Sequence, residues 1–103
     1  VSYKIKEHAE GTGTRQAAIR VKNEIINIIR EEKKPITLDF DGVDVMSSSF
    51  ADELLAKLFI DLGLFQFNLL VKLINIEESL QMLLHKSVLQ RIVESMNEEN
   101  EDV

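Results

Sequence analysis

The chain has 103 residues, of which 45% are apolar and 29% are charged, which is typical of one globular domain and excludes a two-domain or disordered protein. The formal net charge of −6 argues against a nucleic-acid-binding protein, because contacts to phosphates require clustered Lys and Arg. The sequence contains no cysteine, which excludes disulfides and thiolate metal sites, and no apolar run of membrane-spanning length.

The first half of the sequence alternates between strand and helix patterns. Residues 2–6 alternate polar and apolar side chains, which predicts a half-exposed strand. The segment 11–13 then breaks the pattern, and Thr14 is a suitable N-cap for a helix that runs to about Glu31. Residues 36–40 predict the second strand, which ends in a turn. The apolar face of the helix predicted from Thr14 to about Glu31 consists of Ala18, Val21, Ile25, Ile28 and Ile29.

The second half continues this alternation. Residues 46–49 lead into a second predicted helix that ends near Leu62, with Gly63 as its left-handed C-terminal residue. Residues 65–74 predict the third strand, since one of their faces is apolar. Asn75 and Glu78 form a capping-box pattern that opens the final helix. The apolar stripes of the two helices are Phe50, Leu54, Leu55, Leu58, Phe59 and Leu62, and Leu80, Leu83, Leu84, Val88, Leu89, Ile92, Val93 and Met96.

The end of the chain and the order of the elements set the predicted fold. A second capping-box pattern at Ser87 and Gln90 predicts a break or kink near residues 85–87. Residues 97–103 are expected to be a disordered acidic tail, so that the domain covers residues 1–96. The order β-α-β-α-β-α implies a single small α/β domain with a largely parallel or mixed sheet. Because the strands alternate, we expect the helices mainly on one face of the sheet.

A possible enzyme site lies at the end of the second strand. Asp39-Phe40-Asp41-Gly42 is the arrangement in which haloacid-dehalogenase-type phosphatases present a nucleophilic Asp and an acid/base Asp to a metal-bound phosphate. Asp39, Asp41 and Asp44 also suggest calcium ligands, but Gly42 comes too early for an EF-hand. The alternative interpretation is that these aspartates are the polar residues of a strand end and a turn.

The glycine segment and the two histidines are weaker candidates for a functional site. The glycines at positions 11 and 13 precede a helix and could hold a phosphate on backbone amides, although they lack the lysine of a P-loop. His8 and His85 lie on different predicted elements, and neither has an acid or nucleophile partner nearby in the sequence. We expect both to be structural, with His8 facing solvent and His85 on a helix flank, and we predict no cofactor or metal site.

The serine run at residues 47–49 stands at the predicted start of the middle helix. Serine is a preferred N-cap, and Ser49 with Asp52 makes an S-x-x-D capping pattern. A phosphate on this run would lie at the positive end of the helix dipole, which favours it. Asp52 and Glu53 occupy the first turn, however, and would repel further negative charge.

Residues 36–49 resemble the central motif of STAS domains, the fold of bacterial anti-sigma-factor antagonists. The S-S-F-A-D-E sequence at residues 48–53 is similar to that of a family described as a STAS-like domain of unknown function, and the segments 13–29 and 74–92 are similar to its flanking elements. In the antagonists, a partner anti-sigma kinase phosphorylates the first serine of the motif, which releases the complex. The resemblance implies that Ser48 is this serine.

From these observations we expect a non-catalytic, cytoplasmic regulatory module that binds a protein partner, such as an ATP-binding anti-sigma or kinase-like protein, and neither nucleic acid nor a membrane. Two alternatives stay open. One is a small Mg-dependent phosphotransfer enzyme that uses Asp39 and Asp41, and the other is an oligomerising structural domain that pairs through its exposed sheet face. The predicted partner-binding residues are Ser47, Ser48, Ser49, Asp52 and Glu53.

Overall fold

Three short parallel strands form the sheet in this computed structural model, which describes the backbone of residues 1–101 and the side chains of residues 1–97. They are β1 (Ser2–Lys4), β2 (Ile36–Asp39) and β3 (Val71–Ile74), in the order β1-β2-β3. Both pairings are parallel. The predicted α/β fold with a largely parallel sheet is therefore confirmed.

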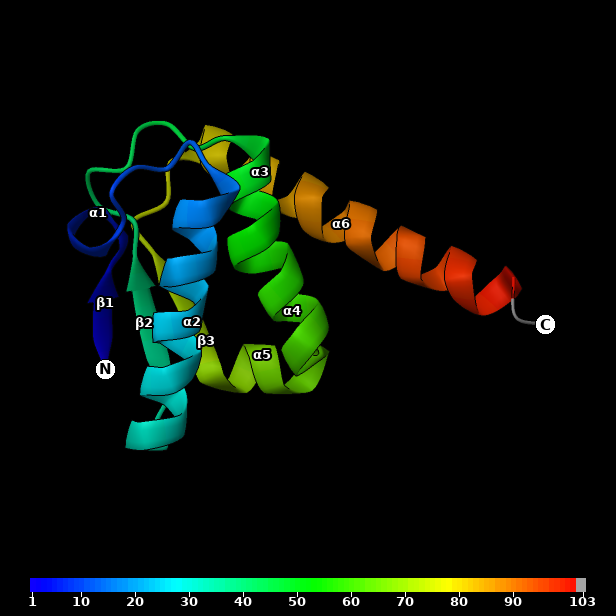
Figure 1. The fold of residues 1–103 in the computed structure, drawn as a ribbon, viewed down its shortest axis with the longest axis horizontal. Coiled ribbons are helices and arrows are strands. Elements are labelled where there is room, and N and C mark those ends of the chain that lie inside the picture. Colours follow the sequence, from blue (N-terminus) through cyan, green and yellow to red (C-terminus); the bar gives the residue numbers. More distant parts are fainter. Residues whose placement is uncertain (102–103) are drawn as a thin grey trace.

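Helices connect the strands and follow the last one (Figure 1). Residues 48–62 form one uninterrupted helical segment, whose middle turn is a π-helix. In chain order the helices are α1 (Ile5–His8), α2 (Arg15–Glu32), α3 (Ser48–Ala51), the π-helix η1 (Asp52–Ala56), α4 (Lys57–Leu62), α5 (Leu64–Leu70) and α6 (Glu78–Glu101). None of these described helices combines the length and apolar character that a bilayer span requires.

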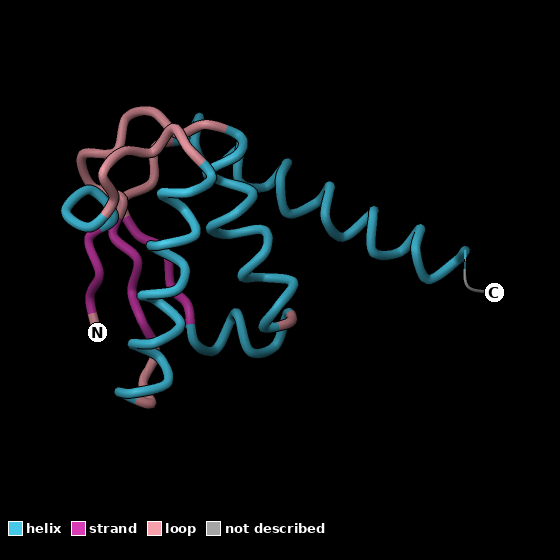
Figure 2. The backbone as a smooth tube through the Cα atoms, in the orientation of Figure 1, coloured by secondary structure: helices cyan, strands magenta, loops and turns pink. Residues whose placement is uncertain are grey.

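The long helices cover one face of the sheet, as predicted. Figures 1 and 2 show the sheet on the left, with α2 and the α3–α4 segment on the same side of it. The strand register places Tyr3, Leu38 and Leu73 in one row, and the first two of these are buried beneath the helices. Lys4 and Lys72 lie on the opposite, open face and are exposed. The strands lie in the sheet in their sequence order. Because both connections between parallel strands have the same handedness, the helices in these connections lie on the same face.

The core lies between this sheet face and the helices. Ala18, Val21 and Ile25 on α2 are buried, as their helical spacing predicts, while Ile28 and Ile29 near the end of the helix are half-buried. The largest fully buried side chains are Tyr3, Ile5, Val21, Ile25, Ile36, Leu38, Phe40, Phe50, Leu54, Leu55 and Leu58.

The predicted third strand is half helix. Residues 65–70 belong to α5, and only Val71–Ile74 pairs in the sheet, matching the four residues of β2. Phe67 and Leu70, three residues apart on α5, pack against the core, whereas Phe65 is 79% exposed. Residues 65–70 carry two patterns at once: apolar side chains alternate, as in a strand, and also recur three residues apart, as in a helix. The alternation was therefore misleading here.

The expected ends of several other elements differ from the structure. Residues 5 and 6 begin α1 instead of ending the first strand. Gly63 has φ 82° and ψ 161°, so its φ is positive but it is extended and not left-handed helical. Asn75 does take the left-handed conformation, with φ 58°, and its side chain bonds Asp39 and does not open a capping box on α6.

Helix α6 is longer and more regular than predicted. It is helical without a break from Glu78 to Glu101, so the kink expected at residues 85–87 is absent from the described helix. The disordered tail expected from residue 97 is helical in its backbone as far as Glu101, and residues 102–103 lie outside the described residues. The domain boundary at residue 96 stays a prediction.

Candidate functional site

The serine run forms the start of the middle helix, but with a different cap from the predicted one. The Ser47 Oγ accepts a hydrogen bond from the backbone N–H of Phe50 at 3.0 Å, so Ser47 is the N-cap. The helix begins at Ser48, and the capping pattern expected for Ser49 and Asp52 is therefore wrong. Ser48 and Ser49 are exposed, which leaves their hydroxyls free of the cap.

Ser48 and Ser49 line a shallow polar pocket of about 270 Å³ between the middle helix and α6. Two arginines from elements distant in sequence reach this pocket: Arg15 begins α2 and Arg91 lies in the middle of α6. The pocket is lined by Arg15, Ser48, Ser49, Asp52, Ser87, Gln90, Arg91 and Glu94.

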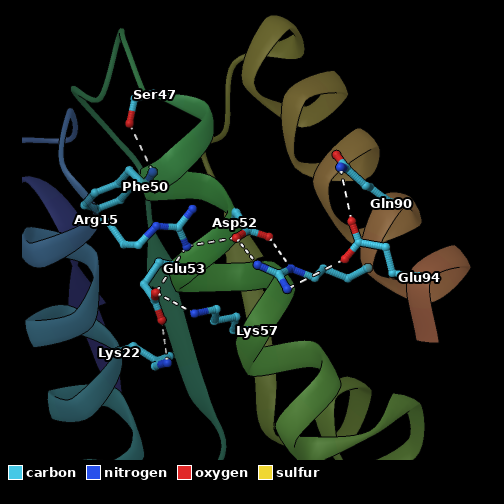
Figure 3. A network of polar contacts seen from close by, with 10 residues as sticks. Arg15, Lys22, Ser47, Phe50, Asp52, Glu53, Lys57, Gln90 and Glu94 are labelled. Atoms are coloured by element: carbon cyan, nitrogen blue, oxygen red, sulfur yellow. Dashed lines mark hydrogen bonds and ion pairs between the residues drawn. The ribbon is translucent and has the colours of Figure 1, made fainter. Parts of the chain in front are cut away.

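Both arginines bind Asp52 (Figure 3). Arg91 donates from Nε to Oδ1 at 2.7 Å and from Nη2 to Oδ2 at 2.5 Å, and Arg15 donates to Oδ2 at 2.9 Å. These charge-assisted bonds, led by those from Arg91, lower the pKa of Asp52 to about 2. Asp52 is therefore ionised at neutral pH and joins α2 to α6.

Glu53 is buried, with only 2% of its surface exposed. Its carboxylate accepts hydrogen bonds from Lys22 at 2.8 Å, Lys57 at 2.9 Å and Arg15 at 3.2 Å. Burial raises the pKa of Glu53, but the bonds from Lys22, Lys57 and Arg15 outweigh it and lower the pKa to about 2. The structure thus removes Glu53 from the predicted docking surface and places it in an internal ion cluster.

The helical geometry explains why adjacent acids have different partners. Asp52 and Glu53 are consecutive residues at the start of η1, so their side chains leave the helix in different directions. In Figure 3, Asp52 points toward α6 and Glu53 toward α2. A π-turn of this kind is often found at functional sites, where it reorients side chains. We call Arg15, Lys22, Asp52, Glu53, Lys57 and Arg91 the ion cluster.

Comparison with known proteins identifies the family. The family described as a STAS-like domain of unknown function (DUF4325) matches residues 17–81, which is more than half of the chain and includes β2, the middle helix and β3. The chain belongs to this STAS-like family. No curated protein and no solved structure matches the sequence. The family assignment made from residues 36–53 is therefore confirmed.

The matched range divides the ion cluster of this STAS-like domain. Asp52 and Glu53 fall within residues 17–81, together with Lys22 and Lys57, the lysine partners of Glu53. Arg15 and Arg91 lie just outside it, before and after the match. The two arginines therefore attach the ends of the described chain to the segment that carries the family pattern.

The aspartates at the end of β2 form a turn in this STAS-like domain. The Asp39 Oδ1 accepts hydrogen bonds from the backbone N–H of Asp41 and from Asn75 Nδ2, both at 2.9 Å. These bonds, chiefly that from Asn75, lower the pKa of Asp39. Within the described part of the chain, no group of three or more His, Cys, Asp or Glu side chains is placed to hold a metal ion. The geometry of Asp39 is that of a strand-end turn.

The glycine segment and His8 contact neighbouring parts of the fold, and His85 lies on the surface of α6. The Thr12 carbonyl accepts a hydrogen bond from the backbone N–H of Ser47 at 2.9 Å, and the Thr12 hydroxyl donates one to the Val45 carbonyl, so this segment supports the loop before the middle helix. His8 is exposed, as expected, and its ring stacks on Tyr3 with centroids 4.2 Å apart. His85 is exposed on α6, in agreement with its predicted place on a helix flank.

The sequence did not identify the basic half of the ion cluster. Lys57 lies four residues after Glu53, a helical spacing that could have signalled the pair. Lys22 is 31 positions from Glu53 and Arg91 is 39 positions from Asp52, and only tertiary packing brings these partners together.

Proposed function

We propose that this STAS-like domain is a non-catalytic, cytoplasmic regulatory module that binds a protein partner at the surface around Ser48 and Ser49. The observation that carries the proposal is the exposure of both serines beside Arg15 and Arg91. Exposed hydroxyls next to arginines form a surface that a polar partner can bind and that a phosphate can modify.

The same arrangement supports phosphorylation of Ser48 as the switch. A phosphoserine carries a charge of roughly −1.5 to −2 at neutral pH and bonds strongly to arginine. The repulsion from Asp52 and Glu53 expected from the sequence is weakened, because each carboxylate already binds at least two cationic side chains. Phosphate on Ser48 would then compete with Asp52 for Arg15 and Arg91, and so alter the surface that a partner contacts.

The partner class comes from the family resemblance. Anti-sigma-factor antagonists bind an ATP-dependent kinase that phosphorylates their serine, and we propose a partner of this kind for Ser48. A role in catalysis has less support, because Asp39, the nucleophile of the phosphotransfer alternative, already accepts two hydrogen bonds on one oxygen within its turn.

The test combines phosphosite mapping with partner binding. The chain is isolated from its native host and its serines are analysed by mass spectrometry, and partners of the wild type, Ser48→Ala and Ser48→Asp proteins are compared by pull-down. We expect phosphate on Ser48 and a partner that Ser48→Asp loses and Ser48→Ala retains. Ser79→Asp, at an exposed serine of α6 outside the pocket, is the matched control. Identical partners for all variants, with no phosphate on Ser48, would refute the switch.

A further inference from the structure

A groove runs along one side of α6, and its larger part is lined mainly by apolar side chains. It consists of two adjoining depressions of about 310 and 480 Å³, which share Leu73, Leu84 and His85. Phe59 and Phe67 line the larger one, with their rings edge to face and centroids 5.4 Å apart. Among the described residues that line the groove, none is Asp, Glu, Lys or Arg. On a chain with 29% charged residues, such a surface suits an apolar occupant.

The outward side of α6 is also apolar. Met82, Leu89, Val93 and Met96 lie on one side of the helix and are 69%, 61%, 46% and 57% exposed. We call these four residues the outer stripe. Leu89 also lines the groove, so the stripe and the groove are continuous. Figure 1 shows that the C-terminal half of α6 extends beyond the body of the domain.

The spacing of the outer stripe is that of a coiled-coil seam. Met82, Leu89 and Met96 are seven residues apart and occupy d positions, while Lys86 and Val93 occupy a positions. Two α6 helices can pack antiparallel about a two-fold axis that crosses them at the level of residue 91. Leu89 of each helix then meets Val93 of the other, so the same contact occurs twice. The stripe is therefore complementary to itself.

The charges along α6 select the antiparallel orientation. Residues 94–101 contain four Glu and no basic residue, whereas residues 81–88 contain Lys86 and His85 and no acid. The antiparallel register places these two segments side by side, whereas a parallel pair would align two acidic segments. The helix dipoles also favour antiparallel neighbours.

We infer that a second copy of this chain covers the groove, with the α6 helices of the two copies packed antiparallel. The dimer buries the outer stripe of each copy against α6 and the groove of the other. This surface shares no residue with the Ser48 pocket, so the inference is independent of the proposed function. A domain of this size buries a modest share of its surface alone and gains stability from such an association.

Sedimentation analysis over a concentration series tests the dimer. We expect wild-type protein to dimerise and Val93→Glu to raise the dimer dissociation constant at least tenfold, because a carboxylate replaces an apolar side chain at the seam. Val45→Glu is the matched control, since Val45 is exposed in the loop before the serine run and lines neither depression of the groove. Circular dichroism verifies that each variant keeps its helix content.

Two outcomes would overturn the dimer. Wild-type protein that stays monomeric up to about 1 mM would exclude an interface of useful strength. A dimer that survives Val93→Glu but dissociates with Lys72→Glu would place the association on the open sheet face, where Lys72 lies.

The orientation is tested by distance measurement, which is convenient because the chain has no cysteine. Met82→Cys introduces a single spin-label site at an exposed position of α6. In the antiparallel dimer the two sites are 18 residues apart along the helices, or about 27 Å. In a parallel dimer they would be about 10 Å apart, and that result would contradict the antiparallel arrangement.

Discussion

Arg91 on α6 donates two hydrogen bonds to the carboxylate of Asp52 on η1, at 2.7 Å and 2.5 Å. The two residues are 39 positions apart, and their pair lies beside the exposed serines of the middle helix. Arg15 binds the same carboxylate from α2. One acid therefore links the first long helix, the serine-bearing helix and the last helix.

Loss of Arg91 should loosen α6. We expect Arg91→Ala to lower the free energy of unfolding by about 2 kcal/mol, because two hydrogen bonds to a partly buried carboxylate are removed. Hydrogen exchange in α6 should accelerate as well. The control is Arg20→Ala, whose ion pair with Glu10 is more than half exposed and should contribute less than ~1 kcal/mol. Equal effects of the two substitutions, measured by urea unfolding, would contradict a structural role for the Arg91–Asp52 pair.

Substitution of Glu53 should lower the free energy of unfolding more than substitution of an exposed acid. Glu53→Ala leaves Lys22, whose side chain is only 13% exposed, without its partner, and we expect a loss of about 3 kcal/mol in the free energy of unfolding. Glu53→Gln should cost less, because the amide oxygen can still accept a hydrogen bond. Glu10→Ala, at an exposed site, is the matched control. A loss below ~1 kcal/mol for Glu53→Ala would show that the ion cluster adds little net stability.

The ion cluster should make the fold sensitive to acid. The pKa values of Asp52 and Glu53 are lowered to about 2 from 3.8 and 4.5, so each group favours the folded state when it is ionised. This stabilisation is complete above about pH 4.5 and is lost as the pH falls toward 2, by about 2 kcal/mol for Asp52 and about 3 kcal/mol for Glu53. Urea unfolding at pH 6 and pH 3 measures the loss. It should be smaller in Glu53→Gln, and an unchanged loss would assign the acid sensitivity to other groups.

The three serines should separate into one structural and two surface residues. Ser47→Ala removes the N-cap and should lower the free energy of unfolding by about 1 kcal/mol, as measured by thermal or urea unfolding. Ser48→Ala and Ser49→Ala should each change it by less than ~0.5 kcal/mol, because both side chains are exposed. If Ser48→Ala were as destabilising as Ser47→Ala, the use of Ser48→Ala as a functional variant would have to be abandoned.

Periodicity predicted the elements well where one pattern dominated. The α2 stripe from Ala18 to Ile29 repeats at helical spacing, and the structure buries its central members. Residues 65–70 were predicted incorrectly as part of a strand, because alternating and three-residue apolar spacings coexist there. On α6 the sequence identified an apolar face, but that face is only partly covered: Leu80 and Leu84 are buried, whereas Val93 is not.

The sequence by itself determined the family, the order of the main strands and helices, and the serine run at a helix start. These features depend on neighbouring residues, whose spacing and capping chemistry are visible in one segment. Only the tertiary structure decided that Glu53 is internal, that Arg15 and Arg91 meet at Asp52, and that the outer stripe of α6 is exposed. Contacts between residues more than 30 positions apart depend on how the helices pack over the sheet, and local patterns carry no information about that packing.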